Sequence, residues 1–180
     1  MHHLFPRLAL DRPMAIGPQT VDATSWHDNL VFVLLFNVGD PSTGDWRSEL
    51  VLDIDHIVEW ICGTNGGARF RIAPATLTFH DVTDLRVSFD FGGSSHRQAL
   101  NELSIAAISQ EPVPTPSVAQ PYGRWRIELN LPRGGEITFG ASGYTQTFRA
   151  EPVLLDDQRL PARGRPPLLL NGELDGGPLR

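Results

Sequence analysis

The sequence predicts a mainly β protein, either an antiparallel β-sandwich or a strongly bent sheet of about seven to nine strands, with at most one or two short helices. Between residues 30 and 149, most runs alternate apolar and polar residues with a period of two, which is the period of a β-strand. Segments rich in glycine and proline separate these runs. Helix-favouring composition is confined to a short segment around residues 96–101, so few helices are expected.

The first two predicted strands carry different patterns. The run LVFVLLFNV, residues 30–38, is continuously apolar, and its valines and phenylalanines favour a strand that is buried on both faces. After the turn-like segment GDPSTGD, residues 48–60 follow a period of two. The leucines and His56 share one face of this second strand, whereas Asp53 and Asp55 share the other, which we interpret as facing solvent.

The middle of the chain predicts short antiparallel strands joined by turns. GTNGG is a turn signal, and the alternation over residues 68–91 predicts two or three strands with a break or an edge position at Pro74. A short helix or turn is expected near residues 96–101, where a capping-box spacing occurs, followed by a strand near residues 103–111. The segment PVPTPSVAQPYG is typical of a proline-rich loop.

Residues 124–148 predict a β-hairpin. Trp125 and Ile127 fall on one face of its first strand, so we expect Trp125 to anchor the core. PRGG supplies the turn, because proline presets one backbone dihedral and glycine permits positive φ. On the returning strand, Tyr144 or Phe148 is expected to share the core with Trp125.

The stretch Gly140-Ala-Ser142-Gly within this hairpin raises the question of a nucleophilic serine. A nucleophile elbow needs Gly-x-Ser-x-Gly at a sharp turn from a strand into a helix. Here the second glycine follows the serine directly, and the next residues, YTQTF, have strand character. Small residues within a strand more often mark a bulge or a close approach of the backbone, so we assign Ser142 no catalytic role.

A length of 180 residues suggests one domain with a substantial core. The strand signals place this single β domain at residues 26–160. Residues 1–25 have mixed composition and contain three prolines, and they are expected to form an N-terminal extension. Residues 161–180 are rich in proline and glycine without a clear period, so they are expected to form a C-terminal tail.

Composition and charge exclude several classes of function. The basic residues number 15 and all are arginine, which excludes a Schiff-base lysine, a pyridoxal phosphate anchor and the lysine of a P-loop. A formal net charge of -6 speaks against nucleic acid as a partner. A single cysteine, Cys62, forms neither an intramolecular disulfide nor a cysteine-based zinc site.

The N-terminal residues lack the sustained apolar stretch of a signal peptide. The longest apolar run, residues 30–36, is too short to span a bilayer. We therefore expect a cytoplasmic protein that has no membrane partner.

Histidine and aspartate residues provide the material for a metal site, with His27, His56, His80 and Asp81 as candidate ligands. Their spacing is not that of a known motif, because the chain has neither His-x-His nor His-Glu-x-x-His. His56 lies on the apolar face, where a hydrogen-bonded core histidine is the commoner case. His27 and His80 each precede an aspartate in a segment typical of a turn. We therefore predict no metal and no other cofactor.

RFRIAPATLTFHDVTDLRVSFDF and WRIELNLPRGGEITFGASGYTQTFRAEPVLLDDQRLP are similar to segments of a group of uncharacterised bacterial proteins of unknown function. The resemblance covers about residues 26–161. The His-Asp pair before the first strand, followed by consecutive β-strands, more distantly resembles immunity proteins of bacterial toxin systems. Neither resemblance implies a catalytic residue.

The leading functional hypothesis is a non-enzymatic binding or interaction module, with a protein partner or a second copy of the chain as its ligand. An immunity-like role is one form of this hypothesis. The alternative is a metal-dependent hydrolase that uses His27, His56, His80 and Asp81. Surface arginines are expected to form exposed ion pairs with acidic residues of neighbouring strands, the arginines being Arg69, Arg71, Arg86, Arg124 and Arg126 and the acids Asp53, Asp55, Asp84, Asp90 and Glu128.

Overall fold

The computed structural model describes residues 14–15, 25–63, 66–92, 102–113, 122–163 and 165–168, and the mainly β prediction is confirmed. Eight of the ten strands in these residues have six residues or more. A single 3₁₀ turn, η1 (Pro41–Thr43), is the only helical element in the described residues, and the predicted helix or turn at 96–101 lies outside them. The strands are β1 (Met14–Ala15), β2 (Leu30–Val38), β3 (Ser48–Cys62), β4 (Ala68–His80), β5 (Thr83–Ser88), β6 (Leu103–Pro112), β7 (Gly123–Leu131), β8 (Glu136–Ala141), β9 (Gly143–Phe148) and β10 (Val153–Leu155).

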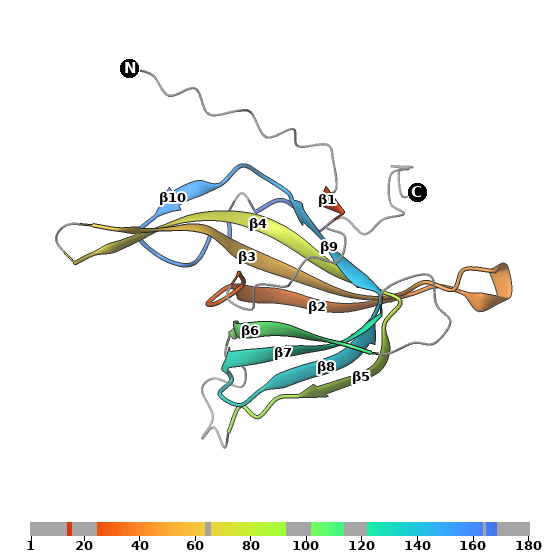
Figure 1. Cartoon of the computed structure of the whole chain (residues 1–180). Coiled ribbons are helices and arrows are strands. Elements are labelled where there is room, and N and C mark those ends of the chain that lie inside the picture. Colours follow the sequence, from red (N-terminus) through yellow and green to blue (C-terminus); the bar gives the residue numbers. More distant parts are fainter. Residues whose placement is uncertain are drawn as a thin grey trace, which may run out of the picture.

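The strands form one antiparallel sheet that is bent back on itself. Their order is β1-β9-β4-β3-β2-β6-β7-β8-β5, and β10 pairs with β4 beyond the end of β9. Figure 1 shows the two layers that result, with β9, β4, β3 and β2 in one and β6, β7, β8 and β5 in the other. Between β2 and β6 the pairing is limited to Leu30 with Ser104 and Val31 with Leu103, so the sheet folds at this junction.

On the opposite side, the chain passes from one layer to the other twice at the same corner. β4 continues into β5 through Asp81 and Val82, and β8 continues into β9 through Ser142. The Ser142 N–H donates to the His80 carbonyl at 3.0 Å, and the Ser142 hydroxyl donates to the Asp81 carboxylate. Asp81 has φ 53°, a left-handed conformation that aspartate tolerates better than most residues. Ser142 therefore joins two bent strands, and strand β9 follows it as predicted.

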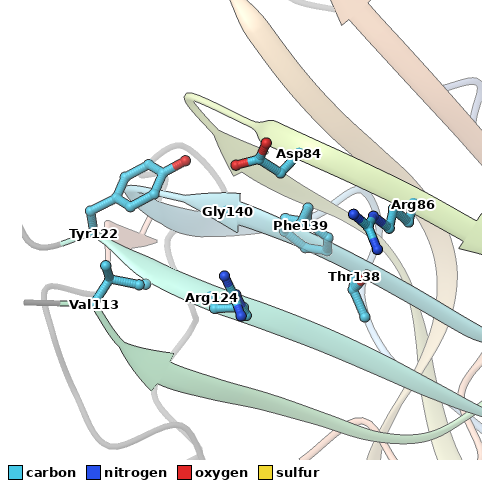
Figure 2. A pocket seen from close by; sticks show the side chains of 9 residues that line it. Asp84, Arg86, Val113, Tyr122, Arg124, Thr138, Phe139 and Gly140 are labelled. Atoms are coloured by element: carbon cyan, nitrogen blue, oxygen red, sulfur yellow. The ribbon is translucent and has the colours of Figure 1, made fainter.

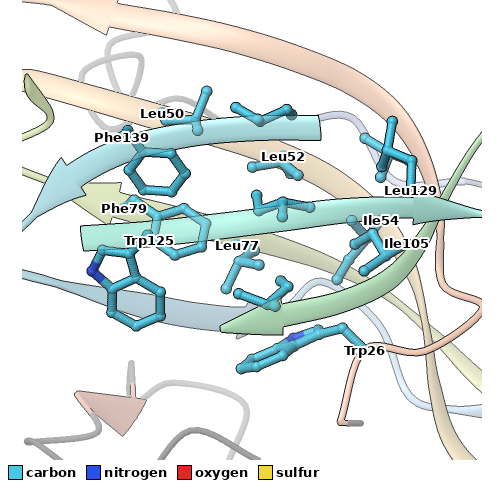
Figure 3. Packing of buried hydrophobic residues seen from close by; sticks show 14 of the residues in the cluster. Trp26, Leu50, Leu52, Ile54, Leu77, Phe79, Ile105, Trp125, Leu129 and Phe139 are labelled. Atoms are coloured by element: carbon cyan, nitrogen blue, oxygen red, sulfur yellow. The ribbon is translucent and has the colours of Figure 1, made fainter. Parts of the chain in front are cut away.

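The main core lies between the two layers (Figure 3). Trp125 is 1% exposed and packs edge-on against Phe79, with ring centroids 5.1 Å apart, and against Tyr144, with centroids 5.6 Å apart. Phe148 also packs against this cluster. The prediction that Trp125 anchors a core shared with Tyr144 and Phe148 is confirmed. These two residues lie on β9, which pairs with β4, so the hairpin predicted over residues 124–148 is limited to β7 and β8.

The prediction that residues 30–38 are buried on both faces is wrong. Phe32, Phe36 and Val38 are 40%, 52% and 72% exposed, whereas Val31 is buried and Leu34 packs partly against the main core. β2 lies where the sheet folds, and past Val31 it pairs only with β3 among the described residues. A continuous apolar run favours a strand, but it does not specify how many faces the fold will cover.

The prediction that Asp53 and Asp55 face solvent is also wrong, since they are 4% and 0% exposed. They lie on the face of β3 that points away from the main core. A second apolar cluster lies on the same side and contains Ile57, Phe70, Ile72 and Leu160. Leu160 belongs to the segment after β10, so residues that follow the last strand cover this side of the sheet. A strand that alternates between apolar and acidic residues is thus buried on both faces.

The predicted domain limits remain a prediction, but residues on both sides of them contact the sheet. Met14 and Ala15 pair with β9, and Arg165 reaches Asp53 and Asp55 on β3.

Candidate functional site

A pocket of about 510 Å³ lies on the outer face of the layer that contains β5, β8 and β7. We call it the arginine pocket and define it by the side chains of Asp84, Arg86, Tyr122, Arg124 and Thr138 around Gly140. Figure 2 shows these side chains around the surface of the three strands. All of them come from strands or from residues next to one, so the backbone holds the pocket in place.

Strand register brings the two arginines to one face. Arg86 on β5 pairs with Thr138 on β8, and Arg124 on β7 pairs with Gly140 on β8. Successive side chains of a strand point to opposite faces. The residues adjacent to Arg124 and Thr138, which are Trp125 and Phe139, therefore point into the main core. The alternation that builds the core also places the arginines together on the outside.

Gly140 forms the floor of the pocket because it has no side chain. A Cβ at this position would lie 2.3 Å from the Tyr122 hydroxyl and 2.9 Å from the Thr83 hydroxyl. Tyr122 instead lies close over β8, where its hydroxyl is hydrogen-bonded to the Thr83 hydroxyl. The close backbone approach expected from the small residues of this stretch is confirmed at Gly140, and Tyr122 is fixed as one wall of the pocket.

The charge of the pocket is positive. Among the described residues, the side chains of Arg86 and Arg124 have no hydrogen-bond or ion-pair partner. The neighbouring Arg126 side chain, in contrast, lies 2.8 Å from Glu136 and 3.4 Å from Glu128. Asp84 is the one acidic residue among those that line the pocket, and it accepts a hydrogen bond from Thr83. Guanidinium groups present several N–H donors in one plane and suit the paired oxygens of a carboxylate or phosphate.

The candidate metal ligands do not come together in the described residues. His27 contacts Asp28 at 3.2 Å, and His80 contacts Glu49 and Thr145 at 3.2 and 3.0 Å. Asp81 accepts a hydrogen bond from Ser142. Across the part of the chain that the structure describes, no three side chains of His, Cys, Asp or Glu form a group that could hold a metal ion.

His56 is half-buried and has a specific hydrogen-bond partner. The Asn29 amide nitrogen donates to His56 Nδ1 at 2.8 Å, and the other end of the same amide accepts from the Ile57 N–H at 3.1 Å. This arrangement places the imidazole proton on Nε2. Burial lowers the pKa of His56 from 6.5 to about 4, because the charged imidazolium is poorly solvated there.

This depressed pKa predicts a loss of stability in acid. Below pH 6.5 the unfolded chain binds a proton at His56 that the folded chain does not, so the free energy of unfolding falls as the pH falls from 6.5 to about 4. We expect His56 to contribute about 2–3 kcal/mol to this loss. Urea unfolding of wild type and His56→Gln at pH 7.5, 6, 5 and 4 measures it. The variant should lose less stability than wild type over this range, and equal losses would contradict the prediction.

A second cavity of about 570 Å³ contains His27 and lies where β2, β6 and β7 end or begin. Two of its carboxylates are engaged by neighbouring side chains. Asn130 donates to Asp28 at 2.7 Å, and Arg159 forms an ion pair with Glu102. Arg133 and Asp157 also line the cavity and carry opposite charges, so it lacks the excess of positive charge of the arginine pocket.

Sequence reasoning missed a buried ion cluster on β3. Arg149 contacts Asp53, and Arg165 Nη1 lies 2.8 Å from Asp55 Oδ1. Arg149 also donates to the carbonyl of Pro166 at 2.7 Å, which ties the residues after β10 to the sheet. Desolvation raises the pKa of Asp53, and the two arginines oppose this rise. We assign the cluster a structural role.

The predicted surface ion pairs are correct only in part. Arg126 pairs with Glu128 as expected. Arg69 and Arg71 pair instead with Asp156 and Glu59, at 2.8 and 3.0 Å.

Comparison of the chain with models of protein families, with curated proteins and with solved structures gives no match. In the described residues, no helix has the length and apolar character needed to cross a membrane.

Proposed function

We propose that this protein is a non-enzymatic binding module that recognises an acidic side chain of a protein partner in the arginine pocket. The observation that carries the proposal is the pair of arginines, Arg86 and Arg124, which share one pocket and have no partner among the described residues. The formal net charge of the chain is -6, so acidic residues are available in excess. A pocket in which two guanidinium groups have no partner among the described residues is suited to an anion supplied from outside.

The pocket is also preorganised for binding. Its arginines extend from the paired strands β5 and β7, and Tyr122 is held by Thr83. A ligand that enters a preformed site pays less conformational entropy than one that must order a loop. Single exposed ion pairs contribute only about 0–1 kcal/mol, and a carboxylate that is bonded by two guanidinium groups at once binds more strongly than one bonded by a single group.

The lining of the pocket supports binding rather than catalysis. The hydroxyls of Tyr122 and Thr83 bond to each other, and Asp84 accepts from Thr83. General acid–base chemistry needs a titratable group aimed at the reacting atom, and an arginine side chain does not serve as an acid or a base. Nucleic acid is disfavoured as the anion, because the net charge repels a polyanion at longer range.

Selection from random heptapeptides displayed on phage tests this proposal. We expect the selected peptides to be enriched in Asp and Glu, and Arg86→Gln or Arg124→Gln to weaken their binding about tenfold, the loss that follows from removing one charge-assisted contact. Arg126→Gln is the matched control, since Arg126 is an exposed arginine on the same face that is already paired. It should leave affinity unchanged. Peptides without acidic enrichment, or equal affinity for all three variants, would overturn the proposal.

A further inference from the structure

The arginine pocket lies beside an open edge of the sheet. β5 is the last strand in the sheet order, and β8 is its only strand partner in the described part of the chain. An edge strand presents unpaired backbone N–H and C=O groups that can bond to another extended chain. The pocket and this edge are contiguous, because Arg86 belongs to both.

The two faces of β5 differ in chemistry. Leu85 and Phe89 pack against the main core, and Val87 follows the same alternation but is 41% exposed at the core's margin. Arg86 and Ser88 lie on the opposite face, in register with Thr138 and Glu136 of β8. An added strand would therefore meet an arginine on one face and an uncovered valine on the other.

We propose that a segment of the protein partner adds to β5 as an extra strand and carries the pattern apolar–acidic–apolar. This inference rests on the proposed function, since the acidic residue is the one that binds Arg86 on the β5 side of the arginine pocket. Directly opposite residues of paired strands have Cβ atoms about 4.5–5.5 Å apart, which brings a Glu or Asp within reach of the Arg86 guanidinium. The flanking apolar residues cover Val87 and extend the main core.

The geometry of β5 also limits the length of the added strand. The register between β5 and β8 is irregular between Thr83 and Arg86, and Asp84 has φ 52°. A left-handed residue within a strand interrupts the regular ladder. Regular pairing is thus available from Arg86 to Ser88, which suits a short segment. The backbone bonds supply affinity and the pocket supplies specificity, as in other cases of strand addition.

N-methylation of a selected heptapeptide tests strand addition separately from pocket binding. In an added strand only every second N–H faces β5, so N-methyl groups at those positions should weaken binding about tenfold, whereas intervening positions should tolerate them. Replacing the acidic Glu of the same peptide with Gln should weaken its binding to the wild-type protein. The same peptide substitution should have little further effect on binding to the Arg86→Gln protein.

Each outcome of this experiment is decisive. Uniform tolerance of N-methylation together with retained dependence on Arg86 would overturn strand addition and leave the proposed function standing. If peptide binding depends on neither Arg86 nor Arg124, both the strand addition and the proposed function are overturned. Light scattering of the free protein should give a monomer, and a dimer that Val87→Lys dissociates would assign the β5 edge to a second copy and contradict the inference. Binding of a single-stranded oligonucleotide that depends on Arg86 would also contradict it.

Discussion

Replacing Trp125 with alanine should lower the free energy of unfolding by about 3–5 kcal/mol. Trp125 is 1% exposed, lies between the layers and contacts the rings of Phe79 and Tyr144. Its indole N–H also donates to the Ala141 carbonyl at 3.4 Å, next to the corner where β8 becomes β9. Alanine would leave a large cavity between strands that a rigid sheet cannot close. Urea denaturation monitored by circular dichroism measures the loss.

Trp46→Ala is the matched control for this prediction. Trp46 lies before β3 and is 77% exposed, so its removal deletes the same atoms from a site that contributes little packing. We expect a change within about 0.5 kcal/mol. If Trp125→Ala unfolds at the same urea concentration as wild type, Trp125 is not the anchor of the core.

Replacing Arg149 with methionine should lower the free energy of unfolding by a similar amount, about 3–5 kcal/mol, because it leaves the Asp53 carboxylate buried with Arg165 as its remaining counterion. Arg165 is 3.9 Å from Asp53 and is engaged more closely by Asp55. The loss of Arg149 also removes its bond to Pro166 and loosens the cover over β3. Thermal or urea unfolding measures the effect.

Two further variants separate burial from charge. Arg69→Met removes an arginine from an exposed pair with Asp156, and it should cost about 0–1 kcal/mol. Combining Arg149→Met with Asp53→Leu removes both buried charges, and it should recover part of the lost stability, since an apolar pair needs no counterion. Equal stability of Arg149→Met and wild type would contradict the buried cluster.

The β-strand content follows from the sequence because each strand carries a local signal. The alternation around Trp125 and Ile127 identifies both a strand and its buried face. The PRGG turn identifies β7 and β8 as a hairpin. Local pattern does not fix the order of strands, however. The bend of the sheet depends on the corner at Asp81 and Ser142, where two strands change layer together, and neither residue carries a signal for that contact.

The errors on β2 and β3 share one physical cause. Burial of a face depends on what the rest of the chain places over it. Phe36 is exposed because the second layer diverges from β2, and Asp53 is buried because Arg149 and residues after β10 cover it. A partial signal for the buried cluster exists: Asp53 and Asp55 stand between apolar residues on both sides in VLDIDHI.

The sequence identifies individual residues of the arginine pocket, but it does not show that they come together. The alternation places Arg86 and Arg124 on solvent-exposed faces. Arginine side chains on such faces are more often solvated than bound to a ligand. Their convergence depends on the register of β5 and β7 with β8, and on Gly140 leaving room for Tyr122. The glycine that raised the question of a nucleophile serves instead as the floor of a binding pocket.

The most direct test of the arginine pocket is to follow the side-chain Nε–Hε resonances of the arginines by NMR during titration with a selected acidic peptide. Arg86→Gln and Arg124→Gln assign two of the signals by their disappearance. We predict that the Arg86 and Arg124 resonances shift in a saturable manner, while those of Arg126 and Arg149, which are already paired, stay in place. Shifts of similar size at all exposed arginines, or unchanged Arg86 and Arg124 signals at saturation, would contradict the proposed site.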